Sequence, residues 1–342
     1  MNINPSQILF LFTLTSGTFL SISANSWLGA WMGLEINLLS FIPLMSNSNN
    51  LLTTEVSLKY FLIQALASTF FLFLITMMHL SFDTTNFSIH KLFPILISFT
   101  LMLKMGAAPF HFWFPGVMEG LNWFNCFILL TWQKIAPLML LSYLIKMSLI
   151  IPFIILSSVM IGSIGGLNQT SLKKIMAYSS INHIGWMIAA MITGENLWMI
   201  YFSIYSFLTI TLTFMFNSFK IFHINQSFST FNNTNSIKFL LFLNLLSLGG
   251  LPPFIGFLPK WMIIQSMVEL NHTFTISIMV IMTLITLFYY LRLSFSAFLL
   301  SYTEFKWITI SIYMNLSFIL SLILSTISIL GLMLCTILFN TF

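Results

Sequence analysis

Apolar stretches of about 20 residues, long enough to cross a bilayer as helices, follow one another along the whole chain. Short polar segments rich in Asn, Ser, Gly and Pro separate them, and these residues favour turns. The pattern predicts an all-α, polytopic membrane protein of about eleven transmembrane helices. The expected spans are residues 5–24, 26–45, 56–80, 92–116, 121–145, 150–167, 172–193, 197–220, 238–269, 275–299 and 310–339. The longest polar piece, roughly residues 222–236, is interpreted as a loop.

Charged residues make up only 6% of the 342 residues, and apolar residues make up 58%. A soluble domain carries about 25% charged residues, so this composition excludes an ordinary soluble fold. The net charge of +5 is thinly spread, with no basic run longer than Lys173-Lys174, which excludes nucleic-acid binding. Cys126 and Cys335 are too few for a zinc site, and phosphate-loop and nucleophile motifs are missing. We therefore expect this chain to bind no cofactor.

Lysine and arginine are concentrated on one side of the predicted helices. The even-numbered connections, with the adjoining helix ends, hold Lys59, Lys173, Lys174, Lys220, Lys238, Arg292 and Lys306. The odd-numbered connections hold only Lys91 and Lys146. Because positive residues stay on the cytoplasmic or matrix side, we expect the N-terminus there and the C-terminus opposite. Residues 1–7 carry no positive side chain, so we expect no cleavable signal peptide.

One ten-residue pattern occurs twice. Residues 106–115 and 250–259 both fit G-x-x-P-F-x-x-[aromatic]-x-P, at an offset of 144. The copies lie in the fourth and ninth predicted spans, which run in opposite directions. Proline removes a backbone donor, so we expect helix breaks at Pro109 and at Pro252 and Pro253. This arrangement predicts an inverted repeat with one broken helix in each half.

Four ionisable residues lie well inside predicted spans: Glu35, Lys104, Lys134 and Lys260. A charge at the centre of a bilayer costs at least ~2.5–3.5 kcal/mol, so these side chains must face water or one another. Burial disfavours the charged form of a lysine, and a nearby carboxylate favours it. A change in that carboxylate's influence therefore lets a lysine load and release a proton. Lys104 and Lys260 lie beside the predicted breaks, where water can enter.

Structural roles for these residues stay open at this stage. A lysine near a helix end can extend its ammonium group to the membrane surface, and Glu35 can form a purely structural ion pair. His183 falls in the middle of a span, where it can relay protons between lysines or serve as a hydrogen-bonded packing residue. His111 lies in the first predicted break, where we favour hydrogen bonding to freed carbonyl groups.

The chain resembles the subunit 2 family of NADH dehydrogenase (ubiquinone) in mitochondrial respiratory complex I, which is one of its antiporter-like subunits. The segments that carry the resemblance are residues 26–38, 106–115, 164–174, 178–186 and 248–254. The resemblance extends over the whole chain, whose length is similar to that of the short, insect-type form. Related complex I subunits and bacterial sodium/proton antiporter subunits share the break pattern but not the first segment.

The resemblance implies two inverted five-helix repeats, each with a broken helix, followed by one C-terminal helix. The expected divisions are residues 1–145, 146–299 and 300–342. The resemblance also implies a location in the mitochondrial inner membrane, with the N-terminus towards the matrix. The implied partners are the other membrane-arm subunits, and FMN, iron–sulfur clusters and ubiquinone are expected in partner subunits.

The resemblance further implies one proton channel, which couples NADH:ubiquinone oxidoreduction to proton pumping. The family's functional glutamate falls on Glu35, and its lysine at the first break falls on Lys104. Its connecting lysine falls on Lys134, and its lysine at the second break falls on Lys260. All four positions match the family pattern.

Two other functions stay open. A cation/proton antiporter subunit would have the same fold and lysines without respiratory partners. In a structural membrane subunit, the buried charged side chains would only form ion pairs with one another. Purification separates these possibilities, because a respiratory subunit should remain in a large complex that oxidises NADH.

Overall fold

A computed structural model describes residues 5–47, 50–81, 87–145, 150–230, 235–300 and 322–332. In these ranges the chain is helical and contains no β-strand. The first helices are α1 (Pro5–Ser23), α2 (Trp27–Met45), α3 (Leu51–Ser81), α4 (Phe87–Met105), α5 (Trp113–Gly120), α6 (Trp123–Leu130) and α7 (Trp132–Leu144). They are followed by α8 (Ile150–Gly166), α9 (Leu172–Thr193), α10 (Glu195–Phe219), α11 (Ile224–Thr230), α12 (Asn235–Gly249), α13 (Phe257–Glu269), α14 (Thr273–Phe295) and the π-helical turn η1 (Ser296–Leu300).

Seven of the described helical segments are long and apolar enough to cross a membrane. They cover Pro5–Ser23, Trp27–Met45, Leu51–Leu80, Trp123–Leu144, Leu172–Thr193, Asn196–Phe219 and Thr273–Phe298. Shorter apolar helices cover Leu92–Met105, Ile150–Gly166, Lys238–Gly249 and Leu322–Leu332. The predicted last span, 310–339, lies largely outside the described residues. The chain is thus an all-helical, multi-pass membrane protein in its described part, and the total of eleven spans stays a prediction.

The chain divides into two units, Met1–Ile151 and Pro152–Phe342. The first unit contains α1 to α7, and the second contains most of α8 and the helices that follow it. The finer division after residue 145, a separate segment from residue 300 and the inverted relation of the repeats stay predictions.

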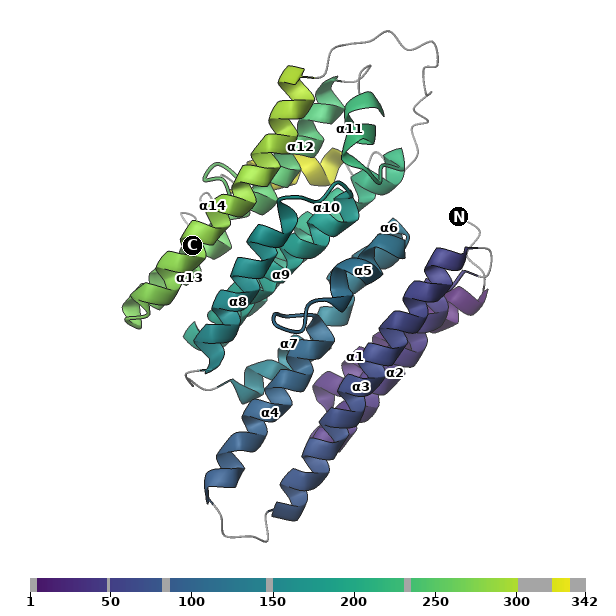
Figure 1. The fold of residues 1–342 in the computed structure, drawn as a ribbon, viewed down its shortest axis with the longest axis vertical. Coiled ribbons are helices and arrows are strands. Elements are labelled where there is room, and N and C mark those ends of the chain that lie inside the picture. Colours follow the sequence, from purple (N-terminus) through teal and green to yellow (C-terminus); the bar gives the residue numbers. More distant parts are fainter. Residues whose placement is uncertain are drawn as a thin grey trace. The chain divides into compact units, whose positions relative to one another are not determined.

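In the first unit, α1 and α2 pack closely because glycines line their contact. A Cβ atom added at Gly33 would lie 2.5 Å from the backbone nitrogen of Ser21, and one at Gly17 would lie 2.9 Å from that of Asn37. Small residues let membrane helices approach in this way. Figure 1 shows α1, α2 and α3 running alongside one another, and α4 next to α7.

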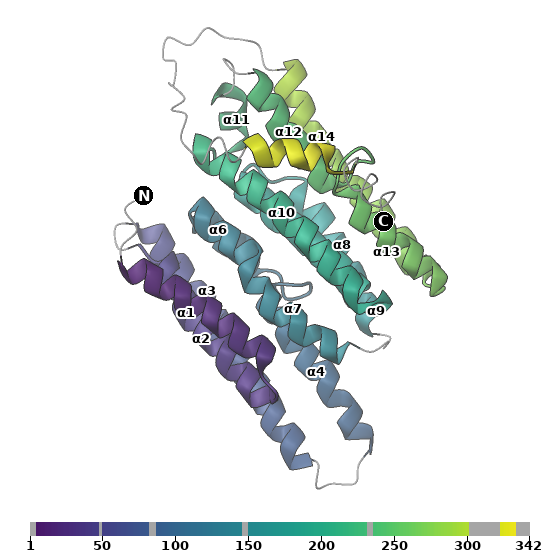
Figure 2. The same ribbon diagram turned by 180° about the vertical axis from the view of Figure 1, so that it is seen from behind.

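In the second unit, α9 is buried along nearly its whole length. The helices α10, α13 and α14 pack against it, and α8 approaches it through glycines. A Cβ atom at Gly162 would lie 2.5 Å from the backbone nitrogen of Asn182, and one at Gly185 would lie 2.4 Å from Ser158 Oγ. The helices α8, α9 and α10 run alongside one another (Figure 2). The mid-span residue His183 is therefore held inside this unit.

The predicted span 121–145 is not one continuous helix. It is interrupted at Thr131, between α6 and α7. Pro137 has no N–H to donate to the carbonyl group of Gln133, so the first turn of α7 loses one helical hydrogen bond. The backbone nitrogen of Lys134 donates to the carbonyl of Thr131 at 3.1 Å, three residues earlier, which is a tighter turn than an α-helix makes.

The segment predicted as a loop, residues 222–236, contains the helix α11. The side-chain oxygen of Gln226 accepts the backbone N–H groups of Phe222 and His223, at 2.8 and 3.2 Å. Such bonds satisfy donors that a helix start leaves without partners. The Asn, Ser and Thr residues of segment 222–236 favour a loop. The hydrogen bonds of the Gln226 side chain allow a short helix to form there instead.

Candidate functional site

The first helix break begins at Gly106, directly after α4. Gly106 has a φ of 75°, and Ala107 N–H donates to the carbonyl of Met102 at 3.0 Å. A left-handed glycine with this six-residue bond is the Schellman motif that ends many helices. Pro109 lies in the break, and the chain becomes helical again at Trp113. Lys104 is consequently the second-last residue of α4.

Two side chains donate to carbonyl groups in the last turn of α4, directly before the first break. Gln64 Nε2 on α3 donates to the carbonyl of Lys104 at 3.1 Å, and Trp113 Nε1 donates to that of Leu103 at 3.2 Å. Polar backbone without a partner is costly inside a membrane, so these bonds stabilise the break. The His111 ring lies 3.3 Å from the carbonyl oxygen of Pro109, in agreement with the bonding favoured for this residue.

A cavity lies beside Lys104 in the first unit. Its lining residues are Leu34, Asn37, Leu38, Tyr60, Gln64, Lys104, Gln133 and Pro137. Its volume of about 20 Å³ is enough for a water molecule. Gln133 Nε2 donates to Asn37 Oδ1 at 3.0 Å, and the Tyr60 hydroxyl donates to Gln133 Oε1 at 3.4 Å. The cavity is therefore polar and can hold water next to a lysine.

Glu35 acts electrostatically on Lys104 without touching it. Coulombic interaction couples the two side chains, but within the described ranges they form no ion pair shorter than 4.0 Å. One carboxylate oxygen of Glu35 is buried and has no hydrogen-bond partner in the described part of the chain. The Lys104 side chain is itself 7% exposed. The pair is thus close enough to interact and not locked into a direct contact.

Lys134 is more deeply buried than Lys104. Its side chain is 1% exposed, and its ammonium group lies 5.3 Å from the centre of the Phe114 ring. Such a position over an aromatic face stabilises a cation. Phe114 belongs to α5, directly after the first break. The first unit therefore holds Glu35, Lys104 and Lys134, and it brings Glu35 and Lys104 into electrostatic contact.

The second break ends α12 in the same way. Gly250 has a φ of 85°, and its N–H donates to the carbonyl of Ser247 at 3.0 Å. Pro252 and Pro253 follow, and α13 begins at Phe257. Lys260 lies in the first turn of α13, and its ammonium group donates to the carbonyl of Gly249 at 2.6 Å. The helix C-terminus has a partial negative charge, which favours this cation.

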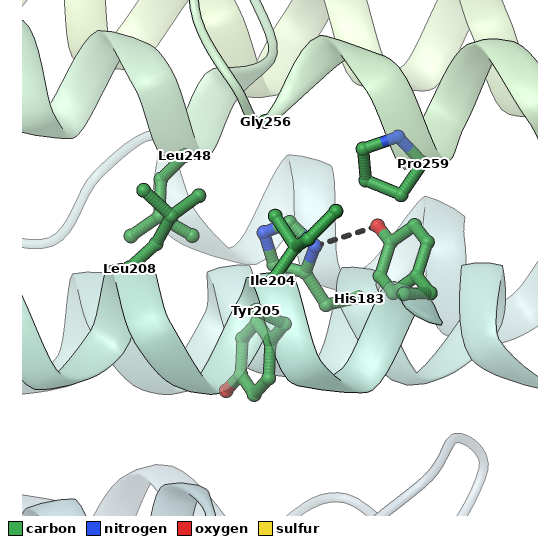
Figure 3. Close-up of a pocket in the computed structure, with 8 residues that line it drawn as sticks. His183, Ile204, Tyr205, Leu208, Leu248, Gly256 and Pro259 are labelled. Carbon is green, nitrogen blue, oxygen red and sulfur yellow. Dashed lines mark hydrogen bonds between the residues drawn. The ribbon is translucent and has the colours of Figure 1, made fainter. Parts of the chain in front are cut away.

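A second cavity lies in the second unit, beside His183. Its lining residues are His183, Tyr201, Ile204, Tyr205, Leu208, Leu248, Gly256 and Pro259. His183 Nδ1 lies 2.7 Å from the Tyr201 hydroxyl, the contact drawn as a dashed line in Figure 3. Pro259, the neighbour of Lys260, lies at the edge of this cavity. The structure therefore places His183 near the second break.

Comparison with known proteins shows the family to which this chain belongs. The model of the family described as NADH:quinone oxidoreductase/Mrp antiporter, TM, matches residues 24–286. A curated relative from Anopheles gambiae, NADH-ubiquinone oxidoreductase chain 2, is 56% identical over 98% of this chain and 98% of its own length. The chain belongs to the NADH:quinone oxidoreductase/Mrp antiporter family.

Chains in two solved structures have the same fold. A chain of respiratory complex I from Thermus thermophilus with bound aureothin is 22% identical, with a TM-score of 0.82, over 96% of this chain and 79% of that chain. A chain of the Mrp complex from Dietzia sp. DQ12-45-1b is 14% identical, with a TM-score of 0.80, over 95% of this chain and 75% of that chain. These likenesses concern the fold of the NADH:quinone oxidoreductase/Mrp antiporter family.

The neutral residues of the site were not predicted from the sequence of this family member. Asn37, Tyr60, Gln64 and Gln133 line the first cavity and form hydrogen bonds there. Their signal in the sequence was weak, since single polar residues in apolar spans are also found as packing residues. Within the described ranges, no group of three or more His, Cys, Asp and Glu residues is placed to hold a metal ion.

Proposed function

We propose that this chain translocates protons as a membrane-arm subunit of respiratory complex I. Its Anopheles gambiae relative, similar over almost the whole length, carries the name NADH-ubiquinone oxidoreductase chain 2. The chain thus works as one subunit of an enzyme that couples NADH:ubiquinone oxidoreduction to proton pumping. Its own contribution is proton movement, and the redox reaction takes place elsewhere in the complex.

The observation that carries the site assignment is the environment of Lys104. This lysine lines a polar cavity that has room for water, stands at the end of a broken helix and interacts with Glu35 across a gap. Within the described ranges, no other lysine combines these three features. Lys104 is accordingly the proton-loading residue of the first half of the path.

The energies involved are sufficient for such a mechanism. Moving a proton against a membrane potential requires ~2.3 kcal/mol per 100 mV. Opposite charges about 6–8 Å apart attract by about 2–3 kcal/mol at an effective dielectric constant of about 20. A change in the position or charge of Glu35 therefore alters the affinity of Lys104 for its proton by an amount comparable to the work of pumping. Lys134 then passes the proton towards Lys260, and His183 relays it within the second unit.

The test is proton pumping by complex I that carries Lys104→Arg, measured as protons translocated per NADH oxidised in membrane vesicles. Arginine does not release its proton at physiological pH, so this ratio should fall while the complex still assembles. Lys59→Arg is the matched control, because Lys59 is an exposed lysine of the same unit. An assembled Lys104→Arg complex with the rate and ratio of the wild type would show that Lys104 is structural.

The proposal includes the topology and location of the chain. We propose eleven transmembrane helices, with the N-terminus in the mitochondrial matrix and the C-terminus on the other side of the inner membrane. The excess of Lys and Arg on the N-terminal side supports this orientation. Protease protection of tagged termini tests it, and two termini on one side would contradict the odd number of helices.

The proposal also covers cofactors and partners. FMN, the iron–sulfur clusters and ubiquinone are bound by partner subunits, and this chain contacts the other membrane-arm subunits and lipid. We expect the purified chain to catalyse no redox reaction. A flavin, haem or cluster with ligands from this chain would contradict this expectation.

A second candidate function is a subunit of a cation/proton antiporter. The likeness in fold to a chain of an Mrp complex supports it. The two functions differ in their partners: a complex I subunit should purify with NADH-oxidising activity, whereas an antiporter subunit should not. The near full-length similarity to a named complex I chain favours the respiratory function.

A further inference from the structure

The two cavities use corresponding positions of the sequence repeat. The offset of 144 that relates the two G-x-x-P-F segments also relates three residues of the first cavity to three of the second. The pairs are Tyr60 with Ile204, Gln64 with Leu208, and Lys104 with Leu248. In every pair, a polar or charged side chain in the first unit corresponds to an apolar one in the second. The second cavity therefore lies at the corresponding position of the repeat in its own unit. Its lining is apolar at these three positions, whereas that of the first cavity is polar or charged.

His183 supplies the titratable group of the second cavity. The position that corresponds to Lys104 is occupied by Leu248, so no lysine lines this cavity. Tyrosines keep their protons near neutral pH, whereas a histidine changes its charge there. Among the lining residues, His183 is thus the one suited to accept and release a proton.

The helix α10 places two tyrosines against the His183 ring. Tyr201 and Tyr205 are four residues apart and share one face of α10. Their ring centres lie 5.9 and 5.0 Å from that of His183. The hydroxyl of Tyr201 is 2.7 Å from His183 Nδ1, while that of Tyr205 is hydrogen-bonded to Ser180. The two tyrosines have similar ring contacts and different hydroxyl partners.

We propose that Tyr201 is a positioning residue for His183, an inference that rests on the proton-relay role given to His183 above. The Tyr201 oxygen accepts the hydrogen of Nδ1–H in both charge states of the imidazole. The bond that one ring nitrogen makes determines which nitrogen exchanges a proton. Neutral His183 therefore takes up a proton at Nε2 to become the imidazolium and loses the same proton from Nε2. Tyr201 neither gains nor loses a proton, and the ring does not turn during the exchange.

Other titratable groups lie on the helices packed against α9. These groups are Glu195, Tyr201 and Tyr205 on α10 and Lys220 directly after it, Lys260 and Glu269 on α13, and Tyr289, Tyr290 and Arg292 on α14. Tyr201 and Tyr205 are the ones whose rings contact His183. Removing the Tyr201 hydroxyl therefore changes the hydrogen bonding of His183 without changing any of these charges.

The experiment compares Tyr201→Phe with Tyr205→Phe in assembled complex I in inner-membrane vesicles. Both variants keep the aromatic ring, and only Tyr201→Phe removes the partner of His183 Nδ1. Protons translocated per NADH are measured across a range of pH. We expect Tyr201→Phe to lower this ratio and to shift its pH dependence, and Tyr205→Phe to change both less, because its hydroxyl is not the partner of His183 Nδ1.

A third variant, His183→Gln, separates the possible failures. If His183→Gln lowers the ratio while Tyr201→Phe matches Tyr205→Phe, the positioning role is wrong and the relay role stands. If His183→Gln also behaves as the wild type, the relay role of His183 is wrong and the inference fails with it. Should Tyr201→Phe fail to assemble, Tyr201→Gln replaces it, since an amide oxygen can accept Nδ1–H. A ratio near that of the wild type in Tyr201→Gln supports the positioning role, and a ratio as low as that of His183→Gln contradicts it.

Discussion

The two helix breaks have the same backbone and differ in what binds their carbonyl groups. Gly106 and Gly250 both adopt a left-handed conformation and both form a Schellman motif. At the first break, the neutral side chains of Gln64 and Trp113 donate to carbonyls in the last turn of α4. At the second break, the ammonium group of Lys260 binds one of them directly.

This difference separates two roles of a buried lysine. Because neutral donors satisfy the first break, the ammonium group of Lys104 is left to the cavity and to Glu35. Lys260 instead serves as a hydrogen-bond donor to the helix end, so its charge and the structure of the break depend on each other. The repeat also places the two lysines differently, since Lys104 precedes its break and Lys260 follows its own.

The largest expected effect comes from replacing each lysine with methionine. Lys260→Met should abolish pumping and also destabilise the complex, because a buried carbonyl without its donor costs about 1–3 kcal/mol. Lys104→Met should abolish pumping without destabilisation, since it removes a buried charge that no direct ion pair compensates. The midpoint of thermal inactivation and the amount of assembled complex measure stability. Equal stability losses in the two variants would contradict the comparison.

A smaller effect is expected from alanine at the two left-handed glycines. Both Gly250→Ala and Gly106→Ala should destabilise the complex by about 1–2 kcal/mol through backbone strain. Only at Gly250 would the new Cβ atom lie 2.9 Å from the Lys260 ammonium nitrogen, whereas at Gly106 it meets the Phe114 side chain at 3.1 Å. Pumping per NADH should therefore fall further in Gly250→Ala. The same ratio in both variants would show that the Lys260 contact has no functional effect.

Removing a neutral donor at the first break should have a smaller effect than the glycine substitutions. Gln64→Leu deprives the Lys104 carbonyl of its side-chain partner and should cost about 1 kcal/mol of stability. The ammonium group of Lys104 keeps its place beside the cavity, so pumping per NADH in the assembled complex should stay close to that of the wild type. Thermal inactivation and the pumping ratio, measured on one preparation, check both parts of this prediction.

The smallest effect is expected at an exposed lysine. Lys59 pairs with Glu55 at 2.5 Å on the surface of α3, and both side chains are 59% exposed. Exposed pairs of this kind contribute about 0.3–0.5 kcal/mol. Lys59→Met should therefore leave pumping and assembly unchanged. A loss as large as that of Lys104→Met would mean that lysine removal itself, rather than position, causes the effects above.

Local sequence signals predicted the helical architecture and the charged part of the site. The apolar stretches coincide with the described membrane helices, and the two Gly-x-x-Pro segments coincide with the interruptions after α4 and α12. The interruption at Thr131 and the short helix α11 were not predicted. Both depend on individual hydrogen bonds, which composition does not encode.

The neutral partners of the site were beyond the reach of sequence reasoning. Tyr60 and Gln133 are 73 positions apart, and Gln133 and Asn37 are 96 positions apart. Whether two such side chains meet depends on how each helix is rotated about its axis. That rotation is determined by packing contacts such as those of Gly17 and Gly33, which involve the other helix as well.

The sequence by itself therefore determined the membrane helices, their two breaks and the buried charges. Each of these follows from short-range chemistry: lipid requires the backbone to bond within its own helix, Gly and Pro end helices locally, and a charge in an apolar span needs a partner wherever the span lies. Tertiary structure alone decided which groups became those partners. Gln64 reaches one freed carbonyl, Lys260 reaches another, and Tyr201 reaches His183, because packing brings separate helices within hydrogen-bonding distance.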